Sequence, residues 1–382
     1  VELIEKLAFL EEAENDDANN LIIDSKALRL LNMAKQEVAN NNPKAAFKHC
    51  LEAVTLAPEM ISVKLFLGKL QLDRGFITDA IVQLEALYKA NSSSVDILFG
   101  LVDAYTEGYK FKKVESLLGV AQNTPGDHLD RLYAARAKYS SYQGNFNVAS
   151  GWLQRAINEN PLNDKNIYSL AKLYLKYHKY SRGRSVLKRA MELDPANIDY
   201  RISFAKVLYE VETSNAAIGY LYSVLENFPD NSKIYSAIGT YYYRSGQIKK
   251  YEDIKEKILS LPTKDVSLYE FLIESSRLDD NVDKMIEYSE SLILISPGNL
   301  KERLNLASTY IGLQKYKKAK KHLDAISSRY DSYPKLQLLY AKLYFLIDKV
   351  DKATMLAERE IKENPTVEDG YNLLGDIYIK EK

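Results

Sequence analysis

Apolar and polar residues alternate with helical periodicity over most of this 382-residue chain. In residues 164–195, apolar positions recur every three or four residues in two runs separated by a short polar turn. Spacing of this kind predicts two amphipathic helices, and Pro195 fits the end of the second one because proline cannot continue a helix. This stretch therefore predicts a helix-turn-helix hairpin.

The same hairpin returns at a fixed interval of 34 residues. Prolines that lie one or two intervals apart mark its end at Pro161, Pro195, Pro229, Pro297 and Pro365. Counted from Ala27, ten such units fit by residue 366, and one further first helix remains. Each unit of a repeat array buries its apolar face against its neighbours, so a chain of this length needs no single large core. The pattern predicts an all-α solenoid.

Small residues recur at two positions of the unit. Position 8 carries Ala34, Gly68, Ala137, Ala171, Ala205, Gly239, Ala307, Ala341 and Gly375. Position 20 carries Ala46, Ala80, Ala149, Gly183, Ala217, Ala319 and Ala353. We expect the two helices of each hairpin to cross closely at these positions, so that enlarging one residue costs about 1–3 kcal/mol through overpacking.

This arrangement resembles the tetratricopeptide repeat, with bulky residues at positions 7 and 24, a small residue at 8, Tyr at 11, Ala at 20 and Pro at 32. The resemblance covers residues 27–382 and is to multi-repeat scaffolds of bacterial type. It implies a right-handed superhelix of about ten and a half repeats. Residues 1–26 would form an N-terminal capping or linker helix with a polar linker, and residues 27–366 ten repeats. Residues 367–382 would form a final helix, either half a repeat or a C-terminal cap.

Three units depart from the pattern. Val102 and Val114 occupy both small positions of repeat three, Ile273 and Met285 those of repeat eight, and Tyr251 occupies position 20 of repeat seven. Bulk at these crossings should splay the helix pair. Repacking without further effect and a functional hinge both remain open for repeats three and eight.

The predicted turn after each first helix is rich in residues that accept a left-handed backbone. These residues are Asn41, Gly75, Gly144, Gly246, Asp280 and Asp348.

Composition excludes several classes of function. The 52 basic residues balance 52 acidic ones, so no net field favours nucleic acid or an anionic membrane. The single cysteine excludes an internal disulfide and a cysteine-based zinc site. No apolar run reaches the length of a membrane span, and no signal-peptide pattern opens the chain. A cytoplasmic location is favoured, and a periplasmic one would follow if a leader or anchor had been removed before Val1.

Catalytic signatures are absent from the sequence. There is no phosphate-binding glycine loop, no HExxH and no GxSxG motif. The four histidines are scattered, and we expect each to be an ordinary surface or loop residue: His49, His128, His178 and His322. Residues 182–185 could hold an anion, but a plain helix start explains them. We therefore expect no enzymatic activity, no cofactor and no metal.

In the tetratricopeptide family, positions 2, 5, 9, 12 and 13 of the first helices line the concave face. In repeats four to seven these positions carry a candidate partner-binding set: Arg131, Lys138, Tyr142, Lys165, Tyr168, Lys172, Lys176, Lys206, Tyr209, Lys233, Tyr243 and Arg244. Eight of these side chains are cationic, and only Asp199 and Glu210 oppose them at the same positions. Lysine interleaved with tyrosine suits an extended acidic peptide, because lysine attracts the ligand and tyrosine gives contact area at low entropic cost. A solvated basic face is the alternative.

Repeats one and two are apolar at the same positions, which include Leu28, Leu31, Val38, Leu65 and Leu72. Repeat three is acidic there, with Asp96, Asp103 and Glu107. Repeats eight to ten turn apolar again, with Leu304, Ile311, Leu338, Phe345 and Leu346 beside Lys335 and Lys342. A capping helix, a continuation of the chain or a docked partner helix could cover these ends.

The sequence thus predicts a protein-binding scaffold or adaptor whose partner is an acidic peptide or protein surface. Three alternatives stay open: an accessory subunit of a bacterial envelope assembly or polysaccharide-export complex, an RNA-binding helical repeat protein, and the regulatory region of a larger signalling protein. Balanced charge disfavours nucleic acid. No small-molecule substrate and no membrane insertion are expected, and a homo-oligomer through exposed terminal repeats is left open. Position 5 is never Lys, so the family's carboxylate clamp for chaperone C-termini is absent.

Overall fold

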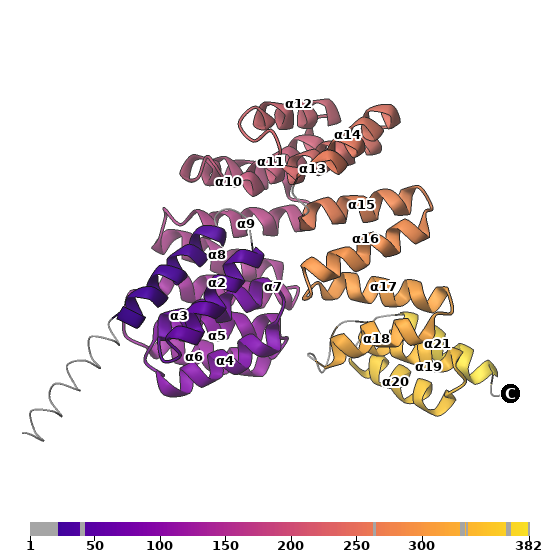
Figure 1. Cartoon of the computed structure of the whole chain (residues 1–382), viewed down its shortest axis with the longest axis horizontal. Helices are drawn as coiled ribbons and strands as arrows, with labels where there is room; N and C mark the ends of the chain where they lie inside the picture. Colours follow the sequence, from indigo (N-terminus) through magenta and orange to yellow (C-terminus); the bar gives the residue numbers. More distant parts are fainter. Residues whose placement is uncertain are drawn as a thin grey trace, which may run out of the picture. The chain divides into compact units, whose positions relative to one another are not determined.

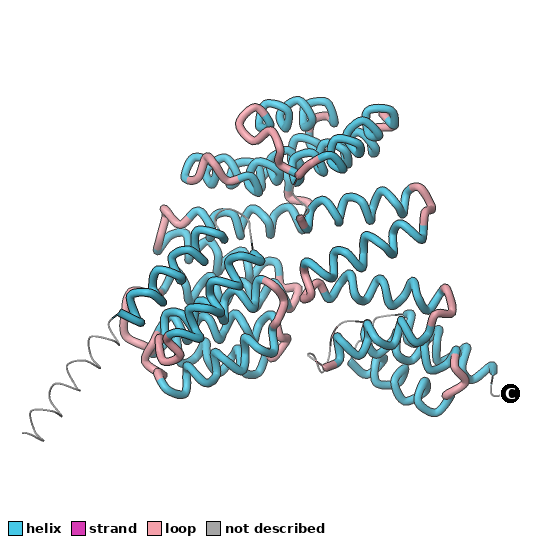
Figure 2. Tube along the Cα trace, viewed as in Figure 1, coloured by secondary structure: helices cyan, strands magenta, loops and turns pink. Residues whose placement is uncertain are grey.

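The computed structural model describes residues 22–38, 43–262, 265–328, 333, 335–363 and 368–380. All regular structure in these ranges is helical, without strands, and short loops join the helices (Figures 1 and 2). The chain divides into two compact units, Val1–Thr124 and Pro125–Lys382.

The first unit holds three hairpins. A helix over residues 22–38 precedes α2 (Pro43–Leu56), and two further pairs follow: α3 (Ile61–Asp73) with α4 (Ile77–Ala90), and α5 (Val95–Glu107) with α6 (Phe111–Asn123). Residues 22–26, which the sequence pattern assigned to a polar linker, are helical. Residues 1–21, which include the rest of the expected N-terminal capping or linker helix and its polar linker, lie outside the described residues.

The second unit continues the hairpins and ends on an unpaired first helix. Its helices are α7 (Leu129–Tyr142), α8 (Phe146–Glu159), α9 (Asp164–Lys176), α10 (Tyr180–Leu193), α11 (Ile198–Val211), α12 (Ser214–Leu225), α13 (Ser232–Arg244), α14 (Ile248–Ser260), α15 (Val266–Leu278), α16 (Val282–Ile295), α17 (Leu300–Gly312), α18 (Tyr316–Ser327), α19 (Leu336–Leu346), α20 (Val350–Glu363) and α21 (Glu368–Lys380).

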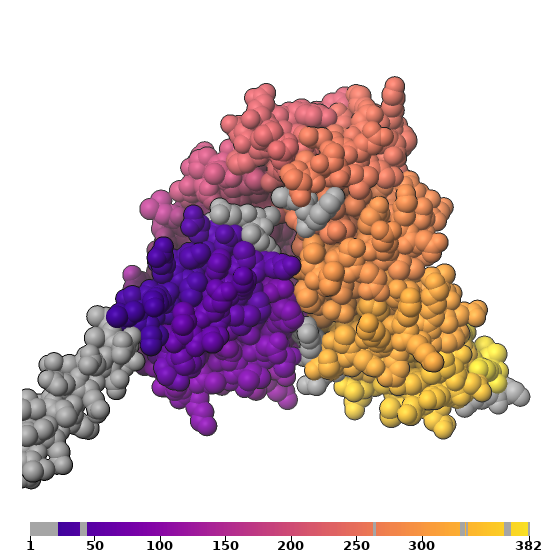
Figure 3. All heavy atoms as spheres, viewed as in Figure 1, coloured from indigo at the N-terminus to yellow at the C-terminus, as the bar shows by residue number. Residues whose placement is uncertain are grey.

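The first helices begin where the 34-residue interval puts them. Asp164, Ile198, Ser232, Val266 and Leu300 open five consecutive hairpins at that spacing. The predicted all-α fold with repeats of the tetratricopeptide type is therefore confirmed. Within each unit, side chains close the spaces between successive helices (Figure 3).

The small positions behave as the sequence pattern predicts. Every alanine at positions 8 and 20 is at most 1% exposed. At Gly68, an added Cβ atom would lie 3.1 Å from the Leu84 side chain, which is tighter than ordinary van der Waals contact. The helices of a hairpin thus approach one another closely where only a small residue fits.

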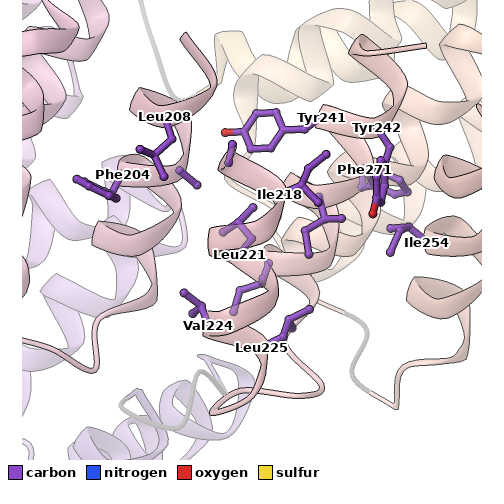
Figure 4. Packing of buried hydrophobic residues seen from close by; sticks show 14 of the residues in the cluster. Phe204, Leu208, Ile218, Leu221, Val224, Leu225, Tyr241, Tyr242, Ile254 and Phe271 are labelled. Carbon is purple, nitrogen blue, oxygen red and sulfur yellow. The ribbon is translucent and has the colours of Figure 1, made fainter. Parts of the chain in front are cut away.

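An apolar cluster runs without interruption through the middle of the second unit. It extends from Ala171 on α9 to Leu272 on α15. Figure 4 shows its central part, with Phe204 and Leu208 from α11, Leu221 from α12, and Tyr241 and Phe271 from α13 and α15. Each hairpin is therefore stabilised mainly by its neighbours, as expected of a solenoid.

The turns confirm the predicted left-handed residues and add others. Gly75, Gly144, Gly246, Asp280 and Asp348 have φ between 52° and 78°, while Asn41 lies outside the described residues. Three residues without a turn signature also have positive φ at the same position: Tyr109 (56°), His178 (55°) and Gln314 (57°). At each of these, the following amide closes the helix end; Lys179 N, for example, donates to Tyr174 O at 2.8 Å.

Repeat six ends its first helix differently. Glu212 has φ −113° instead of a left-handed conformation. The hydroxyl of Thr213 instead accepts from Ala216 N at 3.1 Å and caps α12.

Two histidines are not the surface residues that the sequence suggested. His128 and His322 are each 5% exposed. His322 packs against the ring of Tyr310, with centroids 5.7 Å apart, and its Nε2 lies 3.3 Å from Glu290 Oε1. The expectation was therefore wrong for His322, which is buried within α18, whereas His128 does lie in a loop, directly before α7. Burial of a single polar residue leaves no periodic signal in the sequence.

Candidate functional site

The first helices form the inner layer of the second unit. Neighbouring first helices contact one another from α9 to α15, as α9 does with α11, α11 with α13, and α13 with α15, and again from α17 to α21. Among the described residues, neighbouring second helices make at most isolated contacts. Because the first helices lie closer together than the second helices, the array curves toward them. The face of the first helices that points away from the second helices is therefore the concave face.

The twelve predicted partner-binding residues lie on four of these helices, α7, α9, α11 and α13. Five cations are well exposed: Lys165, Lys172 and Lys176 on α9, Lys206 on α11 and Arg244 on α13. None of the five forms an ion pair within the described part of the chain. We call these five residues with Tyr168, Tyr209 and Tyr243 the basic stripe.

Tyr168 joins α9 to α11. Its hydroxyl lies 3.0 Å from Ser203 Oγ and donates to Asp199 O at 3.3 Å. Its ring packs on that of Tyr200, with centroids 4.4 Å apart, and Lys172 Nζ lies 5.0 Å from the Tyr168 centroid. Burial raises the pKa of Tyr168, so this hydroxyl stays protonated at neutral pH. The lysine thus stands over a ring held in one orientation.

Tyr200 is anchored beneath this contact. Its hydroxyl donates to Asp164 Oδ2 at 2.5 Å, and the side chain is 3% exposed. Burial, and then the hydrogen bond to Asp164, raise the pKa of Tyr200. The Asp164 carboxylate on α9 thus accepts a hydrogen bond from α11 and ties the two helices together.

Tyr209 repeats the arrangement between α11 and α13. Its ring stacks on that of Tyr241 with centroids 4.6 Å apart and an interplanar angle of 13°. The guanidinium carbon of Arg244 lies 5.9 Å from the Tyr209 centroid. A second cation is thus placed beside a second supported ring.

Not every predicted cation is available. Lys233 Nζ forms an ion pair with Asp199 Oδ1 at 3.0 Å across α11 and α13, so one of the eight positive charges is balanced locally. On α7, Arg131 and Lys138 are half-buried and interact with other residues, while Tyr142 is 37% exposed. Unpaired charge is therefore concentrated on α9, α11 and the end of α13.

Sequence reasoning missed the supporting residues. Tyr200, Ser203 and Tyr241 occupy positions 3, 6 and 10 of their repeats, outside the five inward positions that the family resemblance supplied. A signal existed, since Tyr200 and Tyr241 each follow a predicted groove tyrosine by 32 residues, which is close to one repeat.

The first helices α17, α19 and α21 present a different surface. A groove of about 440 Å³ lies over them, with Leu304 and Leu338 in its floor and Lys335, Lys342, Asp369 and Asp376 around it. We call it the C-terminal groove. Leu338 is 9% exposed and Ile311 is 3% exposed, so these residues belong to the core and not to an open apolar face. In the first unit, Leu31 is likewise buried at 2%, whereas Leu28 (46%) and Val38 (43%) are exposed.

The described residues offer no site for metal-dependent chemistry. No group of three or more His, Cys, Asp or Glu side chains in this part of the chain could hold a metal ion. Burial raises the pKa of the Cys50 thiol to about 12, so it is protonated and unreactive. No helix among the described residues has both the length and the apolar character needed to cross a membrane.

No protein-family model matches this chain. No curated protein matches it in sequence. Similar solved structures include TTC0263, a thermophilic TPR protein of Thermus thermophilus, at 20% identity and a TM-score of 0.44, covering 48% of this chain and 99% of that one. A tetratricopeptide repeat protein of Parabacteroides merdae is 13% identical in sequence with a TM-score of 0.42, and the match covers 75% of this chain and 99% of that one. Yeast Tom70 is 14% identical in sequence with a TM-score of 0.43, and the match covers 94% of this chain and 89% of that one. At these TM-scores, the repeat fold rests on the hairpins of this chain itself.

Proposed function

We propose that this protein is a non-enzymatic scaffold that binds an acidic peptide or protein surface along the inner face of α7, α9, α11 and α13. One observation carries the proposal: five exposed cations without ion pairs line this face, set among tyrosine rings held in place from below.

Fixed rings favour a peptide ligand. Tyr168 and Tyr209 are half-buried and each packs on a second tyrosine, so they lose little conformational entropy when a ligand binds. The exposed lysines keep mobile, solvated charges that attract an acidic chain and raise its association rate. Rings give contact area and lysines give charge selection.

The same packing leaves at most one face of Tyr168 and of Tyr209 for stacking with an RNA base. A base would need the free face of an aromatic ring for stacking. Tyr200 covers one side of Tyr168, with Lys172 nearby, and Tyr241 covers one side of Tyr209. The balanced overall charge also gives no net attraction to the phosphate backbone of RNA. A protein is therefore the better supported class of partner.

Fluorescence anisotropy with a short labelled peptide rich in Glu and Asp tests the proposal, with a Lys-rich peptide as the control ligand. The wild type should bind the acidic peptide alone. Lys172→Glu/Lys176→Glu/Arg244→Glu should weaken binding by at least about tenfold, because attraction becomes repulsion. Lys335→Glu/Lys342→Glu, placed in the C-terminal groove, serves as the matched charge reversal and should change affinity little.

If the triple variant binds the acidic peptide as tightly as the wild type does, the peptide does not bind on the basic stripe. Capture from lysate with and without nuclease, followed by mass spectrometry, then identifies the natural partner. A protein retained by the wild type and lost with the triple variant would be assigned to the basic stripe, while loss on nuclease treatment would favour RNA.

A further inference from the structure

A pocket of about 310 Å³ opens between α13 and α15, above α14. Thr240, Tyr243 and Arg244 line it from α13, Tyr251 from α14, and Phe271 and Leu278 from α15. Its volume lies at the lower limit of the roughly 300–1,000 Å³ typical of ligand sites, which suits one side chain better than a whole small molecule.

Tyr251 explains why the pocket is found here. Position 20 holds alanine or glycine in seven of the repeats, but in repeat seven it holds this tyrosine, which is 2% exposed. Its ring meets Tyr243 edge-on, with centroids 5.2 Å apart, and lies 5.8 Å from Phe271. The ring lines the pocket at a position where most repeats have a methyl group, and α15 packs more extensively on α13 than on α14.

Gly239 completes the arrangement at position 8 of the same repeat. A Cβ atom added there would lie 2.7 Å from Phe271 Cε2, so the Phe271 ring occupies the space that an alanine would need. The result is an aromatic pocket in the inner face. The sequence pattern predicted that bulk at position 20 splays the hairpin, but α13 and α14 contact one another as extensively as α11 and α12 do.

The pocket is continuous with the basic stripe. Tyr243 and Arg244 belong to both, and Arg244 also lies beside Tyr209. Thr240 is at position 9 of its repeat, which corresponds to Lys172 and Lys206 on the two preceding first helices. A chain bound along those lysines therefore reaches the mouth of the pocket.

The pocket wall combines aromatic surface with polar groups. Glu274 lies at its edge opposite Arg244. The hydroxyls of Tyr251 and Ser275 are fully buried beside one another and do not reach the open part of the pocket. Thr240, Arg244 and Glu274 supply its accessible polar groups, and polar groups beside an aromatic wall favour an occupant that is itself both aromatic and polar.

We propose that this pocket accepts one tyrosine or tryptophan side chain of the acidic segment bound on the basic stripe. The inference rests on the proposed function and adds an aromatic anchor to it. Acidic residues would lie over α9 and α11, and the anchor would enter between α13 and α15.

Two acidic peptides test this inference, identical except for a central Trp in one and Ala in the other. The wild type should bind the Trp peptide about tenfold more tightly, because a buried aromatic anchor dominates such contacts. Thr240→Phe should fill the pocket and reduce the Trp peptide to the affinity of the Ala peptide, whose own binding should not change.

Ser308→Phe is the matched control, since Ser308 is the exposed position 9 of repeat nine. Thermal unfolding followed by circular dichroism checks that each variant folds. Leu278→Trp fills the pocket from the opposite wall and should act like Thr240→Phe if that variant proves unstable.

The outcomes separate the two proposals. Equal binding of both peptides to the wild type, or a Trp advantage that survives both filled variants, overturns the anchor and leaves the basic stripe intact. No binding of either peptide overturns the proposed function and the anchor with it.

Discussion

The basic stripe and the C-terminal groove lie on equivalent faces of equivalent helices, yet their side chains serve different ends. In the basic stripe, exposed cations without ion pairs stand above tyrosines that are held by other tyrosines. In the C-terminal groove, the apolar floor belongs to the core, as Leu338 at 9% exposure shows, and charges of both signs surround it.

This difference shows which inner positions are free to serve a ligand. Replacing an exposed, unpaired lysine disturbs no packing, so the fold does not require it. Replacing Leu338 removes a side chain that α20 and α21 pack against. The basic stripe is therefore a surface whose chemistry can vary without loss of the fold, whereas the C-terminal groove is constrained by the core.

The largest contrast should come from truncation. Leu338→Ala should lower the free energy of unfolding by about 2–4 kcal/mol through lost burial and a cavity. Lys172→Ala should change it by less than about 0.5 kcal/mol, because its site is exposed. Urea unfolding followed by circular dichroism measures both, and similar losses for the two variants would contradict the distinction.

A smaller effect should separate the tyrosines of the two regions. Tyr200→Phe removes the donor to Asp164 and should destabilise the protein by about 1–2 kcal/mol. Tyr344→Phe, beside the C-terminal groove, removes a hydroxyl that forms no hydrogen bond within the described residues and should be nearly neutral. The same unfolding measurement applies, and a neutral Tyr200→Phe would show that this anchor is dispensable.

Acidic pH should lower the stability of the C-terminal hairpins through protonation of His322. Burial lowers its pKa, partly offset by the nearby Glu290 carboxylate and reinforced by Arg303. The unfolded chain therefore binds a proton more readily than the folded one, so stability should fall as pH drops below the unfolded pKa of about 6.5. His322→Phe, which can still stack on Tyr310, should flatten the stability profile between neutral and mildly acidic pH, and an unchanged slope would assign the effect to other groups.

The smallest effect concerns the ion pair between Lys233 and Asp199, whose side chains are 36% and 54% exposed. A double-mutant cycle with alanine should give a coupling of about 0.2–1 kcal/mol that disappears at high salt. A larger, salt-resistant coupling would mean that this pair holds α11 against α13 and is part of the fold.

Periodic features of the fold were predictable, and isolated ones were not. The small residues from Ala34 to Ala353 recur at nearly fixed spacing because most hairpins have the same close crossing, so the sequence predicts the repeat and its register. The left-handed conformation of Tyr109 carries no such signal, because the end of the helix imposes it on a residue with no special preference.

The candidate site was predictable to a similar degree. Its lysines and outer tyrosines follow from the inward positions of the repeat. Tyr200 and Tyr241 support those rings from positions that the repeat pattern does not mark, and Lys233 is neutralised by a partner one repeat away. Pairings between repeats depend on side-chain direction, which spacing alone does not give.

Several polar bonds between neighbouring hairpins join residues about one repeat apart in the chain. Tyr177 Oη donates to Gly144 O, 33 residues earlier, and Lys233 pairs with Asp199, 34 residues earlier. Because such a bond spans one repeat and no more, excising one whole repeat would leave the bonds on either side of the junction intact. Removing a single residue within a helix would instead displace the partners in that hairpin and at the junctions with its neighbours. Whole repeats are thus the units by which this array can lengthen or shorten with its polar bonds preserved.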